Sequence, residues 1–285
     1  MSTSSFSRRS LIKAAAVIGF PTIVPASVFG ANAPSKRLNI GAIGVGRISR
    51  IHDMVELFKN DDARIIAVCD LDTRRVQQGV ELVDKSYGDK AGTPYSGTRG
   101  YADHHELLAN KDIDGVVIST PDHQHARLAI AAVKAGKDVY CQKPASLTIA
   151  EGRAMADAVA KTDRILQIGS QQRSQDPWPQ FHRACELVRN GRIGKLTHVE
   201  IGLPGDPSGP EAPAMPIPAN LNYDAWLGST PEVYYTEIRV HPQDGEFGRP
   251  GWLRCEQFGA GMITGWGAHH VDIAHWGMDT EHSGP

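Results

Sequence analysis

The chain has 285 residues, of which 41% are hydrophobic and 22% charged, and its 30 lysines and arginines nearly balance its 32 aspartates and glutamates, giving a net charge of -2. These values are typical of a globular protein long enough for two domains, and they argue against a nucleic-acid-binding protein, which carries a basic patch. The four cysteines are widely spaced, which excludes a zinc knuckle and a small disulfide-stapled domain.

Residues 1–33 have the pattern of a twin-arginine export signal. Arg8-Arg9 precedes a moderately apolar run over residues 14–29, and the A-x-A sequence at 31–33 offers a cleavage site. Two prolines interrupt the run, which is also shorter than the roughly 20 residues that a membrane span needs. We therefore predict a cleaved signal peptide, a bacterial periplasmic location and no membrane anchor in the mature protein.

The next stretch predicts a strand, a tight turn and a helix. The apolar run Leu38–Val45 enters the sequence G-V-G-R-I-S at residues 44–49, and Ile51, Val55 and Phe58 then recur at helical spacing. Glycines let a backbone turn tightly and approach a pyrophosphate, while the helix N-terminus supplies amide donors. This pattern predicts a dinucleotide-binding unit in which Gly44, Gly46, Arg47 and Ile48 contact the cofactor.

A second predicted strand, Arg64–Cys69, ends at Asp70. A carboxylate at this position can bind the two ribose hydroxyls, and it favours NAD over NADP because it would repel a 2′-phosphate. Arg74 and Arg75 begin the helix predicted over Thr73–Leu82 and leave NADP possible, since an arginine can pair with that phosphate. We predict that Asp70 and Arg75 contact the cofactor.

A loop over Tyr87–Gly100 and a helix from Asp103 lead to the buried strand Asp114–Thr120, and a helix is predicted over Ala126–Ala135. Ligands of parallel sheets bind at the carboxyl ends of the strands. Thr120, Pro121 and His125 are therefore predicted beside the nicotinamide, although a histidine in the first turn of a helix is equally consistent with capping or packing.

The short strand Val139–Cys141 ends abruptly in Gln142-Lys143-Pro144. Its carboxyl end directs Lys143 at whatever the sheet binds, so Lys143 is the first candidate for catalysis; the alternative is a solvated strand end. A helix over Ile149–Lys161 and a strand over Ile165–Gly169 complete a predicted Rossmann domain, residues 34–172.

Residues 173–285 are predicted to form a substrate and oligomerisation domain. Its expected elements are an amphipathic helix at Phe181–Arg189, an alternating strand at Lys195–Leu203, a proline-rich loop and a helix at Trp266–Trp276. The last helix carries the sequence H-H-x-D-x-x-H from His269. We predict no metal site there, because the second histidine projects about 100° away from the first and no fourth ligand is indicated.

Several motifs together resemble the Gfo/Idh/MocA oxidoreductase family, from about Leu38 to the chain end. They are I-G-x-G-R-I-S, A-V-C-D, S-T-P-D-H-Q-H-A, A-G-K-D-V-Y-C-Q-K-P, G-S-Q-Q-R, R-N-G-R-I-G-K and G-W-G-A-H-H-V-D-I-A-H-W. The resemblance implies an α/β fold: an N-terminal Rossmann domain and an α+β domain with a large, mostly antiparallel sheet, often used for homo-oligomerisation. It also implies NAD or NADP as cofactor and a sugar or polyol as substrate.

Carried over by position, Lys143 and His269 resemble the catalytic lysine and histidine of that family. Gln142 stands where a cofactor-binding glutamate is usual, and Gly265 stands where an acid would orient the histidine, a role that Asp272 could take instead. Removing a carboxylate beside Lys143 should ease its loss of a proton. The resemblance further implies that the substrate is bound by Gln171, Arg173, Trp266, His269 and His270.

These features predict oxidation or reduction of a secondary hydroxyl or keto group of a sugar or polyol, with a tightly retained cofactor. A redox-neutral glycoside hydrolase or lyase and an inactive cofactor-binding protein are the alternatives. The family's last helix is normally followed by further strands, so we expect the antiparallel sheet to be incomplete in this chain.

Overall fold

The computed structural model describes residues 36–205, 208–209, 211–243 and 251–283. The chain divides into two compact units, Met1–Arg37 and Leu38–Pro285, and the second unit contains the central sheet and the helices around it. The predicted signal peptide lies outside the described residues. Within the described ranges, no helix has both the length and the apolar character that crossing a bilayer requires.

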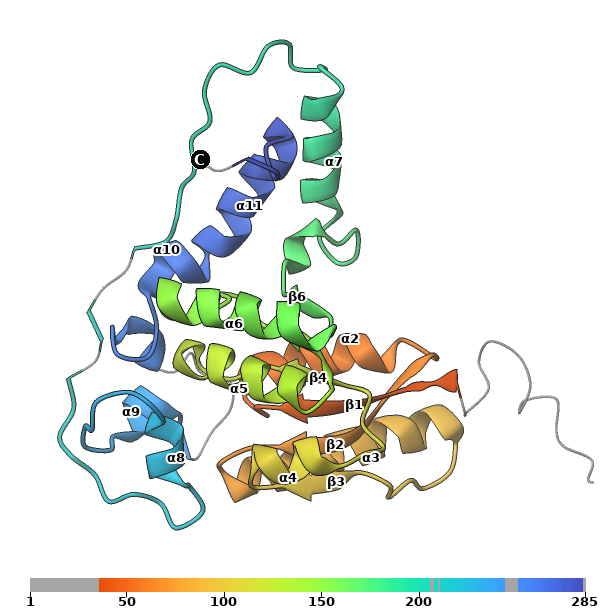
Figure 1. The fold of residues 1–285 in the computed structure, drawn as a ribbon, viewed down its shortest axis with the longest axis vertical. Coiled ribbons are helices and arrows are strands. Elements are labelled where there is room, and N and C mark those ends of the chain that lie inside the picture. The colour runs from red at the N-terminus through yellow and green to blue at the C-terminus, as the bar shows by residue number, and fades with distance from the viewer. Residues whose placement is uncertain (1–35, 206–207, 210, 244–250, 284–285) are drawn as a thin grey trace, which may run out of the picture. The chain divides into compact units, whose positions relative to one another are not determined.

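A six-stranded parallel sheet forms the centre of the unit, with strand order β3-β2-β1-β4-β5-β6 (Figure 1). This is the order of a Rossmann sheet, so the predicted Rossmann fold is confirmed. The strands are β1 (Leu38–Ile43), β2 (Ala63–Cys69), β3 (Arg99–Tyr101), β4 (Gly115–Ile118), β5 (Asp138–Cys141) and β6 (Leu166–Ile168).

The register aligns the carboxyl ends of the three central strands. Ile43 of β1 pairs with Ile118 of β4, which in turn pairs with Cys141 of β5. The segments that follow these strands therefore leave the sheet side by side. The strand order and register therefore bring three segments to one edge of the sheet: the glycine turn, the Ser119-Thr120 pair and Gln142-Lys143.

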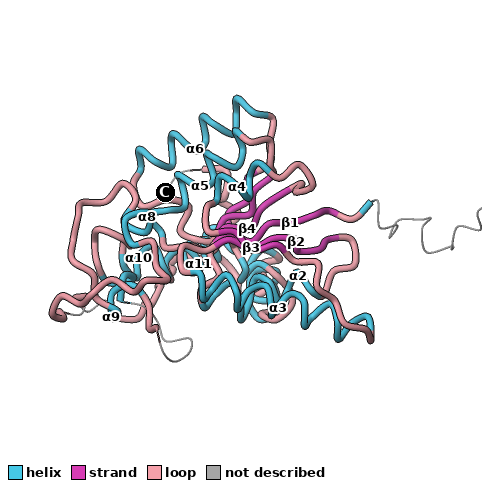
Figure 2. The backbone as a smooth tube through the Cα atoms, turned by 90° about the horizontal axis from the view of Figure 1, so that it is seen from below, coloured by secondary structure: helices cyan, strands magenta, loops and turns pink. Residues whose placement is uncertain are grey.

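Helices cover both faces of the sheet (Figure 2). One face packs against α2 and α3 through a core that includes Val45, Met54 and Val83, and the other packs against α4, α5 and α6 through Leu107, Ala129 and Met155. The helices are α2 (Met54–Phe58), α3 (Thr73–Ala91), α4 (His104–Ala109), α5 (Asp122–Lys134) and α6 (Ile149–Thr162), and a short π-helix, η3 (Ser49–Asp53), precedes α2.

The loop predicted over Tyr87–Gly100 is wrong at both ends. Helix α3 continues to Ala91 because Tyr87 packs with the α3 core and its hydroxyl accepts a hydrogen bond from the Ile65 amide at 2.7 Å. Gly92, with φ of 67°, ends the helix in the left-handed region. At the other end, Arg99–Tyr101 pairs with β2 as β3.

The second half consists of short helices and irregular segments: η4 (Gln171–Arg173), α7 (Pro179–Arg189), α8 (Tyr223–Leu227), α9 (Glu237–Val240), η5 (Gly251–Arg254), α10 (Gly261–Gly265) and α11 (Gly267–Met278). Helices α7 and α11 lie side by side (Figure 1), with the rings of His182 and Trp276 5.3 Å apart. A separate core surrounds Trp226, Tyr235 and Phe258.

The strand predicted at Lys195–Leu203 does not form. These residues are irregular, and Leu196, Val199 and Ile201 each remain more than a third exposed. An alternating segment becomes a strand only when a neighbouring strand completes its backbone hydrogen bonds, and none of the described residues after Ile168 provides one. The predicted antiparallel sheet is therefore not seen in the described part of the chain.

The first turn of α5 joins the sheet to the second half. His123 Nε2 lies 2.7 Å and Gln124 Nε2 2.8 Å from the carbonyl oxygen of Trp226, and both side chains are buried. The P-D-H-Q-H motif thus anchors α8 against the carboxyl end of β4. This contact helps to hold the second half over the edge of the sheet.

Candidate active site

A cavity of about 740 Å³ opens at the carboxyl edge of the sheet. The glycine turn and Asp70 line one end of it, and Lys143 and His269 line the other. Segments of the second half form the facing wall. A cavity of this size between a nucleotide-type sheet edge and a second group of elements is a typical ligand site.

The glycine turn has the geometry that a close ligand approach requires. Gly44 has a φ of 86°, and a Cβ there would lie 2.8 Å from the Thr120 methyl and 2.9 Å from the Ser119 carbonyl carbon. A Cβ on Gly46 would meet only Arg75, at 3.5 Å. The first glycine is therefore needed for packing, and the second leaves open backbone beneath a helical N-terminus, which suits a pyrophosphate.

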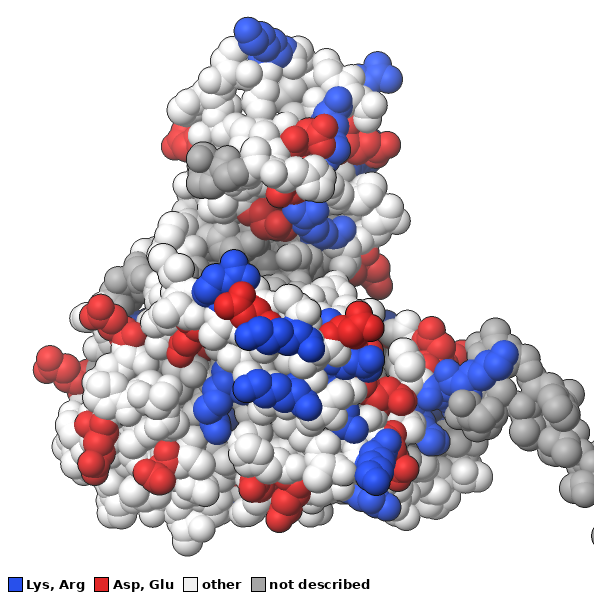
Figure 3. Space-filling model, viewed as in Figure 1, with Lys and Arg blue, Asp and Glu red and all other residues white. Residues whose placement is uncertain are grey.

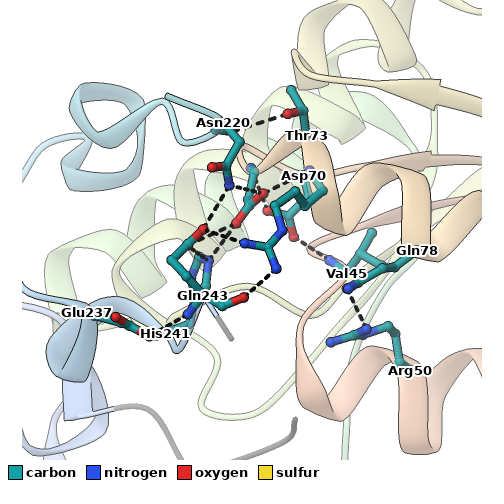
Figure 4. A network of polar contacts seen from close by, with 11 residues as sticks. Val45, Arg50, Asp70, Thr73, Gln78, Asn220, Glu237, His241 and Gln243 are labelled. Carbon is teal, nitrogen blue, oxygen red and sulfur yellow. Dashed lines mark hydrogen bonds and ion pairs between the residues drawn. The ribbon is translucent and has the colours of Figure 1, made fainter. Parts of the chain in front are cut away.

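Asp70 is fixed at the end of β2. Its carboxylate accepts hydrogen bonds from the Val45 amide at 2.7 Å and the Asp72 amide at 3.0 Å (Figure 4). Each carboxylate oxygen keeps further acceptor capacity on the side of the cavity. The turn and the carboxylate together fit the pyrophosphate and adenosine ribose of a dinucleotide.

Most of the predicted cofactor-binding residues line the cavity. They are Gly44, Gly46, Arg47, Ile48, Asp70, Arg75, Thr120, Pro121, Gln142 and Lys143.

His125 does not line it. Its ring is 1% exposed, with Nδ1 2.6 Å from the Pro144 carbonyl oxygen and Nε2 2.9 Å from the Thr120 carbonyl oxygen. Burial lowers the pKa of His125 to about 4, and the two carbonyl oxygens, which can only accept hydrogen bonds, oppose that shift. The predicted cofactor contact does not fit this position. His125 instead supports the Lys143-Pro144 turn from behind.

The reaction end contains a buried carboxylate that the sequence did not reveal. Asp53 is 6% exposed and accepts hydrogen bonds from Gln142 Nε2 at 2.8 and 3.0 Å and from Ser119 Oγ at 2.7 Å. The resemblance implies that a glutamate is usual at position 142. In this chain the residue there is a glutamine, and its amide donates to the carboxylate of Asp53. Asp53 belongs to the short helix after the glycine turn, so a buried carboxylate lies behind Gln142 although positions 142 and 265 carry none.

His52 adds an imidazole to the same group. Its Nδ1 lies 3.0 Å from Asp53 Oδ1, and its ring stacks on Trp178 with centroids 5.4 Å apart. The hydrogen bond with Asp53 raises the pKa of His52 above its usual value, against the opposing effect of burial. Both His52 and Trp178 line the cavity. Sequence reasoning missed His52 because adjacent His and Asp residues in a helix carry no signal by themselves.

His269 lines the cavity as predicted, but the acid expected to orient it is absent. Burial, with the positive charge of Lys143 next in importance, lowers the pKa of His269 to about 4. Its Nδ1 is buried and has no hydrogen-bond partner among the described residues. Gly265, where the resemblance implies an acid, also lines the cavity, and a Cβ there would meet nothing within 4 Å.

Arg173 and Asp272 form an ion pair with two hydrogen bonds. The guanidinium donates two hydrogen bonds to the Asp272 carboxylate, at 2.7 and 2.8 Å, and lies over the Trp276 ring. Neither residue is among those that line the cavity, so Arg173 is engaged by Asp272 in this structure, and its predicted substrate contact stays a prediction. His270, which faces Phe181 and Trp266, is also outside the cavity lining, whereas Gln171 and Trp266 are part of it.

Asp122 is a further buried acid in the lining. It is 5% exposed, and burial raises its pKa to about 7, a shift that the positive charge of Lys143 partly opposes. The cavity therefore holds a carboxyl group that changes protonation near neutral pH, within the electrostatic reach of Lys143.

One group of possible metal ligands occurs among the described residues. Asp103, His104 and His105 bring three ligand atoms within 4.8 Å of one another on the first turn of α4. Asp103 and His105 are exposed, and the Asp103 carboxylate already accepts a hydrogen bond from the His105 amide at 2.8 Å. This group does not include the H-H-x-D-x-x-H histidines.

Residues 38–170 match a family model described as an oxidoreductase family with an NAD-binding Rossmann fold. The matched residues, just under half of the chain, are similar to the Gfo/Idh/MocA oxidoreductase family. The Rossmann half of the chain is accordingly an NAD-binding domain, in agreement with the cofactor predicted from the glycine turn and Asp70.

Three similar proteins illustrate the match. A myo-inositol 2-dehydrogenase from Thermotoga maritima is 35% identical over 158 residues, 55% of this chain and 42% of the relative. A glycosyl hydrolase family 109 protein from Stenotrophomonas maltophilia is 29% identical over 208 residues, 70% of this chain and 42% of the relative. A crystal structure of the WlbA dehydrogenase from Chromobacterium violaceum, in complex with NADH and UDP-GlcNAcA, is 28% identical, with a TM-score of 0.46 over 56% of this chain and 41% of that one. The chain matches less than half of the length of each of these relatives.

Proposed function

We propose that this protein is an NAD-dependent oxidoreductase that acts on a secondary hydroxyl or keto group of a sugar or polyol. The observation that carries the proposal is the single cavity that joins a dinucleotide-type glycine turn and Asp70 at one end to Lys143 and His269 at the other. Bound NAD would accept or return a hydride. The family relationship and the inositol dehydrogenase relative support a hydroxylated carbon as the donor.

The side chains at the reaction end handle the proton of the hydroxyl group. Lys143 is positioned by the Lys143-Pro144 turn, and His125 holds that turn from behind. His269 is neutral at neutral pH, so it can accept a proton or a hydrogen bond from the substrate. Trp178 and Trp266 line the same region and offer flat apolar faces on which a sugar ring can pack.

NAD fits this site better than NADP. The Asp70 carboxylate would repel a 2′-phosphate, and the Arg74 guanidinium is bonded to the Gln243 carbonyl and side-chain oxygens. Arg75 lies against the glycine turn, with its nearest guanidinium nitrogen 3.5 Å from a Cβ placed on Gly46. Arg75 therefore suits the pyrophosphate.

Replacement of the lysine tests the proposal. Lys143→Ala should lower turnover with inositols or other polyols by about 10²- to 10⁴-fold, the usual contribution of a positioned acid or base. Binding of NAD, measured by calorimetry, should stay within a few-fold of wild type. Lys134→Ala removes an exposed lysine at the end of α5 and serves as the matched control. Undiminished turnover in Lys143→Ala would refute the catalytic assignment.

A redox-neutral glycosidase is the second candidate, because the match to the glycosyl hydrolase family 109 relative extends over 70% of this chain. In such a reaction bound NAD would take a hydride from a sugar carbon, and the neighbouring C–H would become acidic. Loss of that proton and of the glycosidic group would leave a C=C bond, water would add across it, and the hydride would be returned to the oxidised carbon. Two assays distinguish a glycosidase from a dehydrogenase. Release of phenol from an aryl glycoside, with no added nucleotide and no net formation of NADH, favours the glycosidase. Stoichiometric formation of NADH from NAD and a polyol favours the dehydrogenase.

We also propose that the protein is exported by the twin-arginine route and works in the periplasm, on the strength of Arg8-Arg9 and the A-x-A sequence at 31–33. Because that compartment has no dependable pool of nucleotide, the cofactor would be loaded before export. Arg8→Lys with Arg9→Lys should then keep the protein in the cytoplasm, and an unchanged periplasmic fraction of the double variant would contradict this route.

A further inference from the structure

The acid that follows Asp70 is buried at the adenosine end of the site. Asp72 is 2% exposed, and its Oδ1 accepts hydrogen bonds from the Arg74 amide at 2.9 Å and Asn220 Nδ2 at 2.7 Å. Its Oδ2 lies 2.8 Å from His241 Nε2 and 3.3 Å from Gln243 Nε2. Burial alone would raise the pKa of Asp72, but the bonds from His241, Asn220 and Arg74 lower it below the usual range. The carboxylate is thus held ionised, mostly by groups from the second half of the chain.

The backbone makes the same connection. The Thr73 amide donates to the Asn220 carbonyl oxygen at 2.9 Å, the Asn222 amide donates to the Leu71 carbonyl oxygen at 3.0 Å, and Asp72 and Leu221 form an antiparallel bridge. Figure 4 shows Asn220, His241 and Gln243 approaching the turn after β2 from the second half. Two segments about 150 residues apart in sequence are therefore fastened at the adenosine end.

The fastened segment is also a wall of the cavity. His241, Pro242 and Gln243 line it together with Asp70, Arg75 and Gln78. The segment is braced from outside, because the Gln243 amide donates to Glu237 Oε1 at 2.6 Å. A ligand that occupies the Asp70 end therefore has the β2 turn on one side and this segment on the other.

We propose that His241–Gln243 is a latch that closes over the adenosine half of bound NAD and slows its release. This inference rests on the proposed function, since it assumes that NAD occupies the cavity. To open the latch, His241 must leave Asp72, and a buried carboxylate that loses its charged or hydrogen-bonding partner is strongly disfavoured. The cost of opening is then a barrier that a departing adenosine group has to cross.

Release kinetics test the latch directly. We would load purified full-length protein with NAD, dilute it and follow dissociation, and in parallel measure the affinities for ADP-ribose, which has the adenosine half, and nicotinamide mononucleotide, which lacks it. His241→Ala should release NAD at least tenfold faster and bind ADP-ribose more weakly, while its affinity for nicotinamide mononucleotide stays within twofold of wild type. His241→Gln, which keeps a donor, should recover most of the slow release.

Two further variants guard against a simple loss of folding. Gln243→Ala removes the side-chain contacts to Asp72, Arg74, Asn220 and His241. It keeps the His241–Asp72 bond and the bond from Arg74 to the Gln243 backbone carbonyl, and it should accelerate release about threefold or more. His198→Ala, at an exposed histidine of the irregular 195–205 segment, should have no effect. Release from His241→Ala within twofold of wild type, or an equal loss of affinity for nicotinamide mononucleotide, would overturn the latch. If wild type binds no dinucleotide at all, the proposed function fails instead.

Discussion

The two ends of the cavity treat their carboxylates differently. At the adenosine end, Asp70 and Asp72 are surrounded by amides and side chains that fix them in one place. At the reaction end, Asp53 is also fixed, by Gln142 and Ser119. Two imidazole nitrogens of that end, His52 Nε2 and His269 Nδ1, are instead buried without a hydrogen-bond partner among the described residues. Buried nitrogens left unpaired are unfavourable. The comparison indicates that the adenosine end fixes its carboxylates in place, whereas the reaction end leaves imidazole nitrogens available for hydrogen bonds with a ligand.

The surface that is visible in Figure 3 shows no comparable division. Lysines and arginines are interspersed with acidic side chains on that face of the second unit.

The largest expected effect comes from adding a second acid beside Asp53. Gln142→Glu would replace a donor that lies 2.8 Å from Asp53 with a like charge, and we expect a loss of unfolding free energy of about 3–5 kcal/mol, as for an uncompensated buried charge. Urea denaturation at neutral pH measures it. The double variant Asp53→Asn with Gln142→Glu exchanges donor and acceptor and should recover most of the loss. If the double variant is as unstable as the single one, Asp53 is not the partner that matters.

A smaller effect is expected from Asp122 and depends on pH. Because its pKa is raised to about 7 in the folded state, the folded protein binds a proton that the unfolded chain gives up near pH 4, so the contribution of Asp122 to stability is complete below pH 4 and is lost as pH rises to about 7. Asp122→Asn cannot titrate, so it should avoid this loss. The free energy of unfolding of the variant relative to wild type should be higher at pH 8 than at pH 4, by up to about 4 kcal/mol. Thermal melting across this range tests the sign. A wild-type profile and a variant profile with the same slope would contradict it.

The smallest expected effect is a gain at the reaction end. Gly265→Asp places a carboxylate in open space one helical turn before His269, where it can accept a hydrogen bond from the imidazole. We expect the pKa of His269 to rise from about 4 and turnover to increase by about tenfold. The pH profile of turnover would report both, with Gly265→Asn as the uncharged control. A profile identical to that of Gly265→Asn would show that orientation of this histidine does not limit the reaction.

The parts of the site that local sequence predicts are those built from one strand and its turn. Gly44, Asp70 and Lys143 each follow an apolar run, and the Rossmann order then brings them together. The Asp53–Gln142 bond joins residues 89 apart and the His241–Asp72 bond joins residues 169 apart, so no local pattern marks either. Arg173 illustrates the same point: the resemblance implied a substrate contact, and only the fold reveals that an acid 99 residues later pairs with it.

The second half is the least predictable, because its short helices depend on contacts with the Rossmann half more than on their own periodicity. Helix α8 has five residues and is held by His123 and Gln124 from the first turn of α5. The alternating pattern at residues 195–203 indicates a strand, yet strand formation depends on a pairing partner that a pattern cannot supply.

Two buried cysteines, one at the end of β2 and one at the end of β5, allow the two ends of the cavity to be compared by chemical modification. Cys69 immediately precedes Asp70, Cys141 immediately precedes Gln142, and both are free and inaccessible. Burial raises the pKa of both thiols, that of Cys141 to about 12, so neither reacts readily with alkylating reagents in the folded protein. The rate at which each peptide becomes alkylated, resolved by mass spectrometry, would therefore report separately how often the holding end and the reacting end of the cavity open.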